Sequence, residues 1–240
     1  MARLSFITDA TLEMAVSTVL KKAETAKIRF AHKIDTNVID PFSMLFELAG
    51  FNCDEKTWLE LESQRKAQKT LSNAIGAFHE TLLGSIAGWE VLNNGGLDLV
   101  STEHRIVAEI KNKHNTVKGS DRVRIYDLLE KKVMDKGQQY EGYTAYFVEI
   151  IPKSAQRYEK PFTPSDNSKG QKRRDNPLIR QIDGYSFYGK VTGVPDALAQ
   201  IFHILPEIIQ QQSTTAYTFA NLEGVNAFFK KAFHGMASSC

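Results

Sequence analysis

The amino-acid sequence predicts one mixed α/β domain in which a β-sheet is flanked by helices. Two short apolar segments, 97–101 and 105–110, predict a hairpin, and a nearly continuous apolar segment at 143–151 predicts a buried strand. A helical segment separates the hairpin from that later strand. A strand, a helix and a second strand in this order form a right-handed crossover, so the sheet should contain parallel and antiparallel pairs.

The composition fits a globular protein without a dominant charge. The chain has 240 residues, 42% of them hydrophobic, and a net charge of +2, so any strongly basic surface must be local. Cys53 and Cys240 have neither zinc-site nor disulfide-framework spacing, which fits a reducing, cytoplasmic setting. The N-terminus lacks a signal-peptide core, and no run of about 18 apolar residues predicts a membrane span.

We expect a single domain over residues 1–240, made of three parts. Residues 1–87 should be mainly helical, residues 88–193 should form the sheet, and residues 194–240 should return to helices. Within these parts we expect helices at 9–31, 41–50 and 121–140, the last capped by Ser120, and either one long helix or two over 54–87. The segment from Ile182 to Tyr188 is expected to form a strand or hairpin.

The hairpin register brings acidic side chains together. If Val100 faces Val107, then Asp98 faces Glu109, and strand alternation puts Lys111 on the same side as Glu109. Like charges directly opposite each other destabilise a sheet, so this arrangement makes sense if a cation lies between them. The alternative is an ordinary hairpin with a charge cluster in water.

Mg²⁺ suits such a pair, because it binds one or two carboxylates together with waters and substrate phosphate. A metal held in this way lowers the pKa of a bound water and clamps a phosphoryl oxygen. Lys111 would orient that water or stabilise developing negative charge.

The order of these residues, an Asp, ten residues, then Glu-x-Lys, resembles the active site of the PD-(D/E)XK nucleases. Leu97 stands where the family name has Pro. The resemblance implies a restriction-endonuclease-like fold, with Asp98 and Glu109 as metal ligands and Lys111 as the catalytic lysine.

Glu80 is a candidate third acid of this site. It lies on the helix before the hairpin, on a face of small residues that would let another backbone approach. Many restriction endonucleases place a glutamate on the corresponding helix. A solvated helical glutamate is the alternative.

Over most of its length the chain also resembles the small group of type II restriction endonucleases that recognise GGNCC. The likeness is clearest in residues 95–113 and 182–188. It implies a bacterial cytoplasmic homodimer that needs Mg²⁺ and cuts both strands of double-stranded DNA to leave 5′-phosphates. It also implies a cognate DNA methyltransferase as a genetic partner rather than a bound subunit.

Two segments are candidates for DNA contact. The first is polar and basic and follows the Glu109 strand, next to the expected metal; its candidate contacts are Lys113, His114, Asn115 and Lys118, and a plain loop is the alternative. The second, at 152–177, has seven basic and three acidic residues, a net charge of +4, and is rich in proline. We expect it to be an irregular loop that closes over DNA, since long loops are usually functional or disordered.

Within this basic loop, Arg173 and Arg174 are candidates for guanine readout, and Lys169 and Lys172 for phosphate contact. Arg180 and Asp183 follow as candidate base or phosphate contacts, with a structural ion pair as the alternative. A merely solvated loop is the alternative for the whole segment.

Competing functions remain open at this point. A repair or junction-resolving nuclease would share the active site but bind branched DNA with little sequence preference. A non-catalytic DNA-binding protein would not need two carboxylates beside a lysine, and no helix-turn-helix or zinc-finger spacing supports it. Kinase and dehydrogenase functions are disfavoured because neither glycine-rich phosphate-binding motif occurs.

Overall fold

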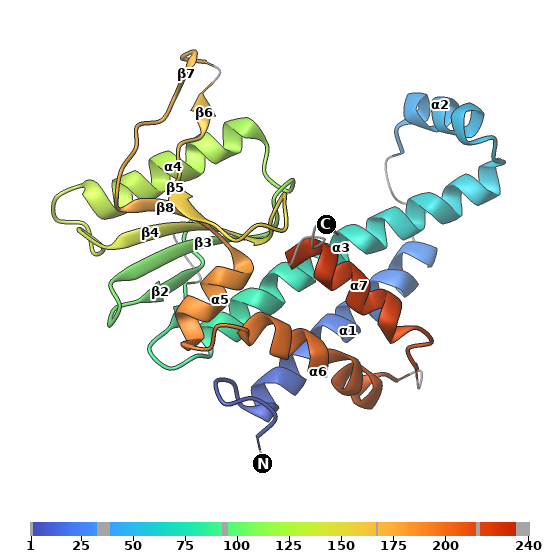
Figure 1. Cartoon of the computed structure of the whole chain (residues 1–240). Coiled ribbons are helices and arrows are strands. Elements are labelled where there is room, and N and C mark those ends of the chain that lie inside the picture. Colours follow the sequence, from blue (N-terminus) through green and yellow to red (C-terminus); the bar gives the residue numbers. More distant parts are fainter. Residues whose placement is uncertain (1, 33–38, 93–95, 167, 215–216, 234–240) are drawn as a thin grey trace, which may run out of the picture.

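A computed structural model describes residues 2–32, 39–92, 96–166, 168–214 and 217–233 (Figure 1). Cys240 lies outside these residues, and Cys53 is a free thiol. The helices are α1 (Asp9–His32), α2 (Pro41–Phe51), α3 (Glu55–Gly84), α4 (Gly119–Met134), α5 (Gly184–Thr192), α6 (Ala197–Gln212) and α7 (Leu222–Phe233). The strands are β1 (Glu90–Val91), β2 (Leu99–Ser101), β3 (Ile106–Lys113), β4 (Thr144–Ile151), β5 (Glu159–Pro161), β6 (Ser165–Asp166), β7 (Gln171–Lys172) and β8 (Ile179–Asp183).

Six strands form one mixed sheet in the order β1-β2-β3-β4-β8-β5. β2 and β3 form the predicted antiparallel hairpin, and Val100 faces Val107 as the sequence predicts. β4 lies parallel to β3 and to β8, whereas β5 is antiparallel to β8. The helix α4 connects β3 to β4, which confirms the predicted crossover and the mixed sheet.

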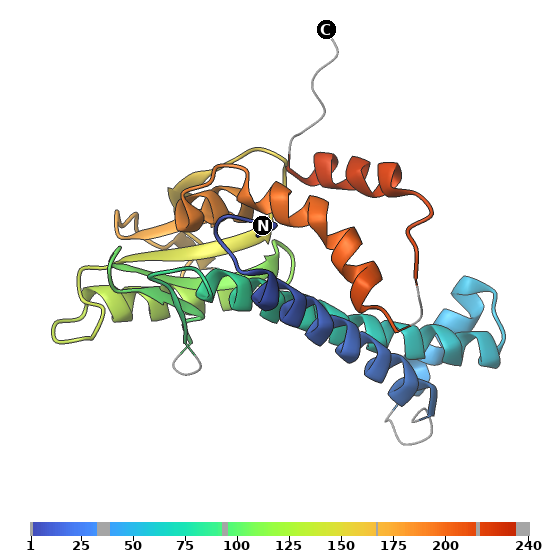
Figure 2. The ribbon, with the colours of Figure 1, turned by 90° about the horizontal axis from the view of Figure 1, so that it is seen from below.

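Helices cover both faces of the sheet (Figure 2). On one face α4 packs through Tyr126, Leu129 and Val133 against alternate residues of β3, β4 and β8. On the other face α3, α5, α1 and α6 form a larger core with the remaining strand residues. Because both faces are covered, β4 is apolar almost throughout. In the described part of the chain, no helix is both long and apolar enough to cross a membrane.

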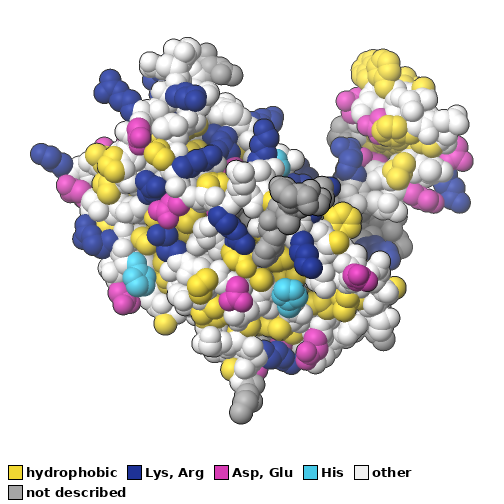
Figure 3. Space-filling model, viewed as in Figure 1, with side chains coloured by type: hydrophobic (Ala, Val, Ile, Leu, Met, Phe, Trp, Pro, Cys, Tyr) yellow, Lys and Arg dark blue, Asp and Glu magenta, His cyan; other side chains and the backbone are white. Residues whose placement is uncertain are grey.

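α2 stands apart from these layers, beside the N-terminal end of α3 and away from the sheet (Figure 1). None of its residues is buried. Figure 3 shows hydrophobic side chains gathered on this projecting helix.

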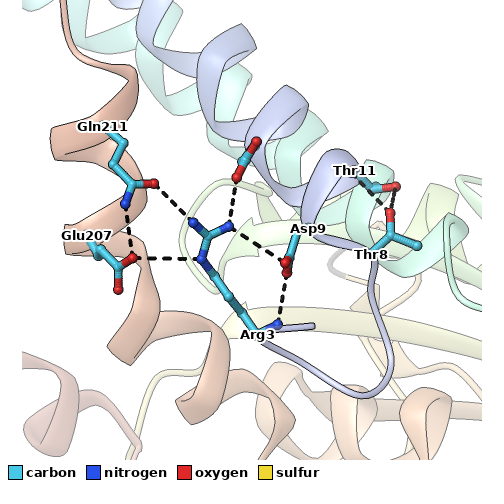
Figure 4. Close-up of polar contacts among 7 residues, drawn as sticks. Arg3, Thr8, Asp9, Thr11, Glu207 and Gln211 are labelled. Atoms are coloured by element: carbon cyan, nitrogen blue, oxygen red, sulfur yellow. Dashed lines mark hydrogen bonds and ion pairs between the residues drawn. The ribbon is translucent and has the colours of Figure 1, made fainter. Parts of the chain in front are cut away.

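An arginine close to the N-terminus ties distant helices together (Figure 4). The Arg3 guanidinium donates to Glu13 of α1 at 2.7 Å and to Gln211 of α6 at 3.1 Å, and its backbone N–H donates to Asp9 at 3.0 Å. The network orients α6 against α1 on the side of the molecule away from α4.

The segment from Ile182 to Tyr188 is a strand only as far as Asp183 and then a helix, which corrects part of the sequence prediction. β8 ends at Asp183, whose carboxylate accepts a hydrogen bond from the Ser186 backbone N–H at 2.9 Å and so begins α5. A Cβ on Gly184 would lie 2.4 Å from the Ile150 Cα, so only glycine allows this helix to start so close to β4. The aromatic residues that suggested a strand face the core from α5 instead.

Two further predictions need correction. α4 begins at Gly119 and ends at Met134, not at 140, and Ser120 does not cap it, because Lys118 holds the cap position without a side-chain hydrogen bond. The chain turns at Gly137, which has a φ of 78°.

The segment 152–177 is not irregular throughout: β5 joins the main sheet, and β6 and β7 form a separate antiparallel ribbon. The fully buried Phe162 anchors the segment, which the high proportion of charged residues concealed.

Candidate active site

The hairpin brings Asp98, Glu109 and Lys111 together. The Lys111 Nζ lies 2.6 Å from Glu109 Oε1 and 3.9 Å from Asp98 Oδ2. The second interaction of Asp98 is structural, since its Oδ2 accepts the Ile110 backbone N–H at 2.6 Å and fixes the carboxylate at the start of β2. The structure therefore brings together the two acids and the lysine that the sequence predicted, because of the register in which β2 pairs with β3.

Burial controls the ionisation of this group. Removal from water, followed by the charge of nearby Asp98, raises the pKa of Glu109 from 4.5 to about 7. For Lys111 burial acts in the opposite direction, but the hydrogen bond from its ammonium to Glu109 and the surrounding carboxylates outweigh it and raise the pKa. Lys111 is therefore a cation at neutral pH, whereas Glu109 exchanges a proton near neutrality.

Glu80 of α3 belongs to the same neighbourhood. It lines a cavity of about 750 Å³ between α3, β3 and α4, together with Glu109 and Lys111. Burial, and next the charge of Asp98, raise the pKa of Glu80. Asp98 does not line the cavity but retains 23% side-chain exposure. The structure thus brings the third candidate acid, on α3, close to the two acids of the hairpin.

One buried oxygen atom supports the binding of a divalent cation by these carboxylates. Glu109 Oε2 is buried and has no hydrogen-bond partner among the described residues. A buried carboxylate oxygen without a partner is costly, and a hard cation would satisfy it. Within the described ranges no three His, Cys, Asp or Glu side chains are close enough to share a metal. Two carboxylates, waters and a bound phosphate are the ligand set that Mg²⁺ prefers.

The raised pKa of Glu109 makes a prediction about stability. Between pH 4.5 and about 7 the folded chain holds a proton that the unfolded chain has lost, so the free energy of unfolding should decrease as pH rises. Glu109→Gln should abolish this contribution and make the metal-free protein more stable than the parent at pH 8, by on the order of 2 kcal/mol. Thermal unfolding in EDTA at pH 5 and pH 8 measures it.

The control for this prediction is Glu103→Gln, which changes an exposed carboxylate of the same hairpin. The free energy of unfolding of Glu103→Gln should match that of the parent at both pH values. An equal stability difference between Glu109→Gln and the parent at pH 5 and pH 8 would contradict the raised pKa.

The polar segment after β3 runs from the candidate site along its edge. Lys113, Asn115 and Lys118 are exposed, and Lys118 holds the N-cap position of α4. His114 is held by its backbone N–H, which donates to Ile151 at 3.0 Å, while its buried Nδ1 lacks a partner in the described chain. The three exposed side chains do not line the cavity itself but are open to solvent beyond it, whereas His114 is more constrained.

The basic segment divides into exposed and ion-paired residues. Lys169, Lys172 and Arg174 are exposed and form no ion pair with any residue that the structure describes. Arg173 instead lies 2.7 Å from Asp127 of α4 and 3.2 Å from Asp166 of β6. It joins the base of the ribbon to α4, so as the structure stands it is not free to contact a base.

Arg180 and Asp183 also have structural partners. Arg180 Nε donates to Glu159 at 3.0 Å, which pairs β8 with β5. Asp183 is 1% exposed and accepts hydrogen bonds from Tyr158 and Ser186. As the structure stands, its position at the end of a buried strand makes it a helix cap, and a base contact would require it to lose these hydrogen bonds.

Two arginines of α4 were not predicted. Arg124 is 83% exposed at the side chain and lines the cavity of Glu109 as well as a second cavity between α4 and the ribbon. Arg122 is bound at 2.5 Å to Glu149, which lies beside Lys111 in the register of β3 and β4. The signal in the sequence was their position in the first turns of the helix that follows the polar segment.

The sequence of the chain is similar to those of known proteins. The profile of a family described as Eco47II restriction endonuclease matches residues 4–213. The type II restriction enzyme Eco47II of Escherichia coli is 44% identical over 211 residues, which are 88% of this chain and 88% of that protein. The type II restriction enzyme Sau96I of Staphylococcus aureus is 33% identical over 209 residues, covering 85% of this chain and 78% of that protein.

Proposed function

The chain belongs to the Eco47II restriction endonuclease family and is a site-specific deoxyribonuclease, and we propose that it uses Mg²⁺ to cut both strands of double-stranded DNA at GGNCC. The proposed metal binding and cleavage are supported by the Asp98–Glu109–Lys111 group. In this group a buried carboxylate oxygen of Glu109 lacks a partner in the described chain. The GGNCC site is supported by the resemblance of the sequence to the enzymes that recognise it.

Asp98 and Glu109 would hold the ion, and Glu80 would complete its surroundings through water. Mg²⁺, when bound, lowers the pKa of a coordinated water and offsets the charge of the scissile phosphate. Lys111 remains an ammonium and stabilises the negative charge that develops on the phosphate oxygens as water adds to phosphorus. The P–O3′ bond breaks, which leaves a 5′-phosphate and a 3′-hydroxyl.

One residue, Arg124, connects the surroundings of this group with the basic ribbon. Arg124 lines both the cavity of Glu109 and the cavity bounded by Ser165, Ser168 and Lys169 of the ribbon segment. A two-stranded ribbon is narrow enough to enter the DNA major groove. We therefore place the scissile phosphate at Lys111, a neighbouring phosphate at Arg124 and the recognition bases at the ribbon.

A palindromic site and a double-strand break favour a homodimer. One chain of 27.0 kDa carries one candidate metal site, whereas two phosphodiester bonds must be cut. A two-fold protein matches the two-fold symmetry of the DNA sequence. We also propose a cognate DNA methyltransferase as genetic partner, because the sites of the host must be protected from cleavage.

The direct test is digestion of unmethylated phage DNA with and without Mg²⁺. We expect discrete fragments whose ends map to GGNCC and carry 5′-phosphates, and no cleavage in EDTA. Discrete fragments with other end sequences would overturn the recognition site alone. Degradation without sequence preference, or cutting only of branched DNA, would favour a repair nuclease instead.

The ribbon makes a separate prediction about specificity. Lys169→Ala and Lys172→Ala should each weaken binding to all sequences and reduce the salt slope by about one unit, because each variant neutralises one phosphate fewer. Arg174→Ala, if Arg174 contacts guanine, should cost roughly 1–3 kcal/mol on the cognate site only. Fluorescence anisotropy at several salt concentrations, on cognate and scrambled duplexes, separates these effects.

Arg173→Ala serves as the comparison within the same ribbon. Because Arg173 holds the ribbon to α4, its removal should make residues 165–172 more susceptible to protease and lower specific binding indirectly. Asp127→Asn removes the same ion pair but changes no residue that we place on DNA, so it should cause the same protease susceptibility and the same loss of specific binding. If Arg173→Ala weakens cognate binding while Asp127→Asn and protease sensitivity are unchanged, Arg173 contacts DNA directly.

A further inference from the structure

The exposed apolar surface of α2 is a feature that the catalytic site does not explain. Phe42, Leu45 and Phe46 are 73%, 67% and 79% exposed. Together with Ala49 they occur at positions i, i+3, i+4 and i+7, which places them on one face of the helix. This spacing is typical of a helix face that packs against another helix. We call these four residues the α2 seam.

The inner face of α2 is the more polar one. Ser43 and Glu47 face α3, where the Trp58 indole N–H donates to Glu47 at 2.8 Å and the Ser43 hydroxyl donates to the same carboxylate at 2.8 Å. Asp40 caps the helix, and Asn52 ends it in a left-handed conformation. The orientation is thus fixed by specific contacts, and it turns the apolar face outward.

The chemistry of α2 identifies the kind of partner. The helix contains no lysine or arginine, and its single charged residue is Glu47, so it offers nothing to DNA phosphates or to an anionic membrane surface. An uncharged apolar seam instead fits another apolar helix. A second copy of the same seam meets it without repulsion between like charges.

We propose that two copies of this chain pair through their α2 seams, which form an isologous helix–helix contact. This inference rests on the proposed function, since cutting both strands calls for two copies. Three large side chains from each copy would cover roughly 800 Å², most of the about 1,000 Å² that a specific interface needs. The small residues Ala49 and Gly50 allow the two helix backbones to approach.

The position of α2 is compatible with a shared duplex. Trp58, where α2 packs, and Glu80, at the catalytic cavity, are 22 residues apart on α3, which is about 33 Å of helix. Pairing at α2 therefore leaves both cavities open. Two chains joined there reach the same duplex when their α3 helices extend side by side toward it.

The test is the oligomeric state of the full chain without DNA. We expect sedimentation equilibrium to give twice 27.0 kDa for the parent. The double variant Leu45→Glu, Phe46→Glu should raise the dissociation constant of the dimer at least about 100-fold. Its circular dichroism and thermal unfolding should match the parent, because neither side chain is buried in one chain. The matched control, Met14→Glu with Ile28→Glu, changes two similarly exposed residues of α1 and should remain dimeric.

Chemical cross-linking provides a second test, in which the proposed contact produces a positive signal. With Cys53 and Cys240 changed to Ser, Leu45→Cys should be joined to a second copy by a short bismaleimide, whereas Met14→Cys should not. A plasmid assay then tests the link to function, because the α2 double variant should accumulate nicked circles where the parent produces linear DNA.

The outcomes separate the two proposals. A parent that is monomeric with and without DNA yet cuts it, or a double variant that remains dimeric, overturns the α2 interface and leaves the restriction activity intact. A parent that does not cut DNA but becomes monomeric through the α2 substitutions supports the interface and counts against the proposed function.

Discussion

Glu109→Gln is expected to lower the rate of DNA cleavage by at least about 1,000-fold, because a metal that offsets phosphate charge contributes several kcal/mol to the transition state. Gln has nearly the shape of Glu but cannot supply the charge that a divalent cation requires. The buried Oε2 without a partner in the described chain is the oxygen whose replacement matters most. Single-turnover cleavage of a cognate duplex measures the effect.

Two comparisons make this result specific to the metal site. Glu103→Gln, on the same hairpin but outside the cavity, should cut as the parent does. Asp98→Asn should also be inactive while it keeps an acceptor for the Ile110 N–H, so inactivity there cannot be ascribed to a broken strand. Cleavage by Glu109→Gln at the parental rate would show that the metal is held elsewhere.

Lys111→Ala is expected to reduce cleavage roughly 100- to 1,000-fold while cognate DNA binding in EDTA changes little. Its ammonium, fixed at 2.6 Å from Glu109, acts on charge that develops only in the transition state. Lys111→Arg should also be poor, since a planar guanidinium cannot occupy the position of a compact ammonium. Single-turnover rates and anisotropy on the same duplex separate catalysis from binding.

Lys113→Ala is the matched control, two residues further along β3 and exposed to solvent. It should weaken binding with a smaller salt slope and leave the cleavage rate of bound DNA unchanged. If Lys111→Ala instead reduced binding and cleavage in equal measure, Lys111 would be a phosphate anchor rather than a catalytic group.

The hairpin and the candidate catalytic group could be predicted from the order of the amino acids alone. Strand alternation and a short turn leave one register that buries the apolar residues, and this register brings Asp98 and Glu109 next to Lys111. The crossover to β4 could also be predicted, because the apolar residues of β4 are typical of a strand that is covered on both faces. These features depend on local periodicity, which is visible in the sequence.

Features that depend on contacts between distant segments could be recognised only in three dimensions. α5 can start at position 184 only with glycine, because the Ile150 backbone leaves no room for a side chain, and Asp183 is a cap because that helix follows it. Arg173 pairs with Asp127, which is 46 residues away, so its charge alone could not distinguish a base contact from a structural one. Likewise, the spacing of the apolar residues of α2 shows that they share a face, but only the contact of Glu47 with Trp58 shows that this face is turned toward solvent. Periodicity tells which residues share a face, whereas the partner of that face depends on the packing of the whole chain.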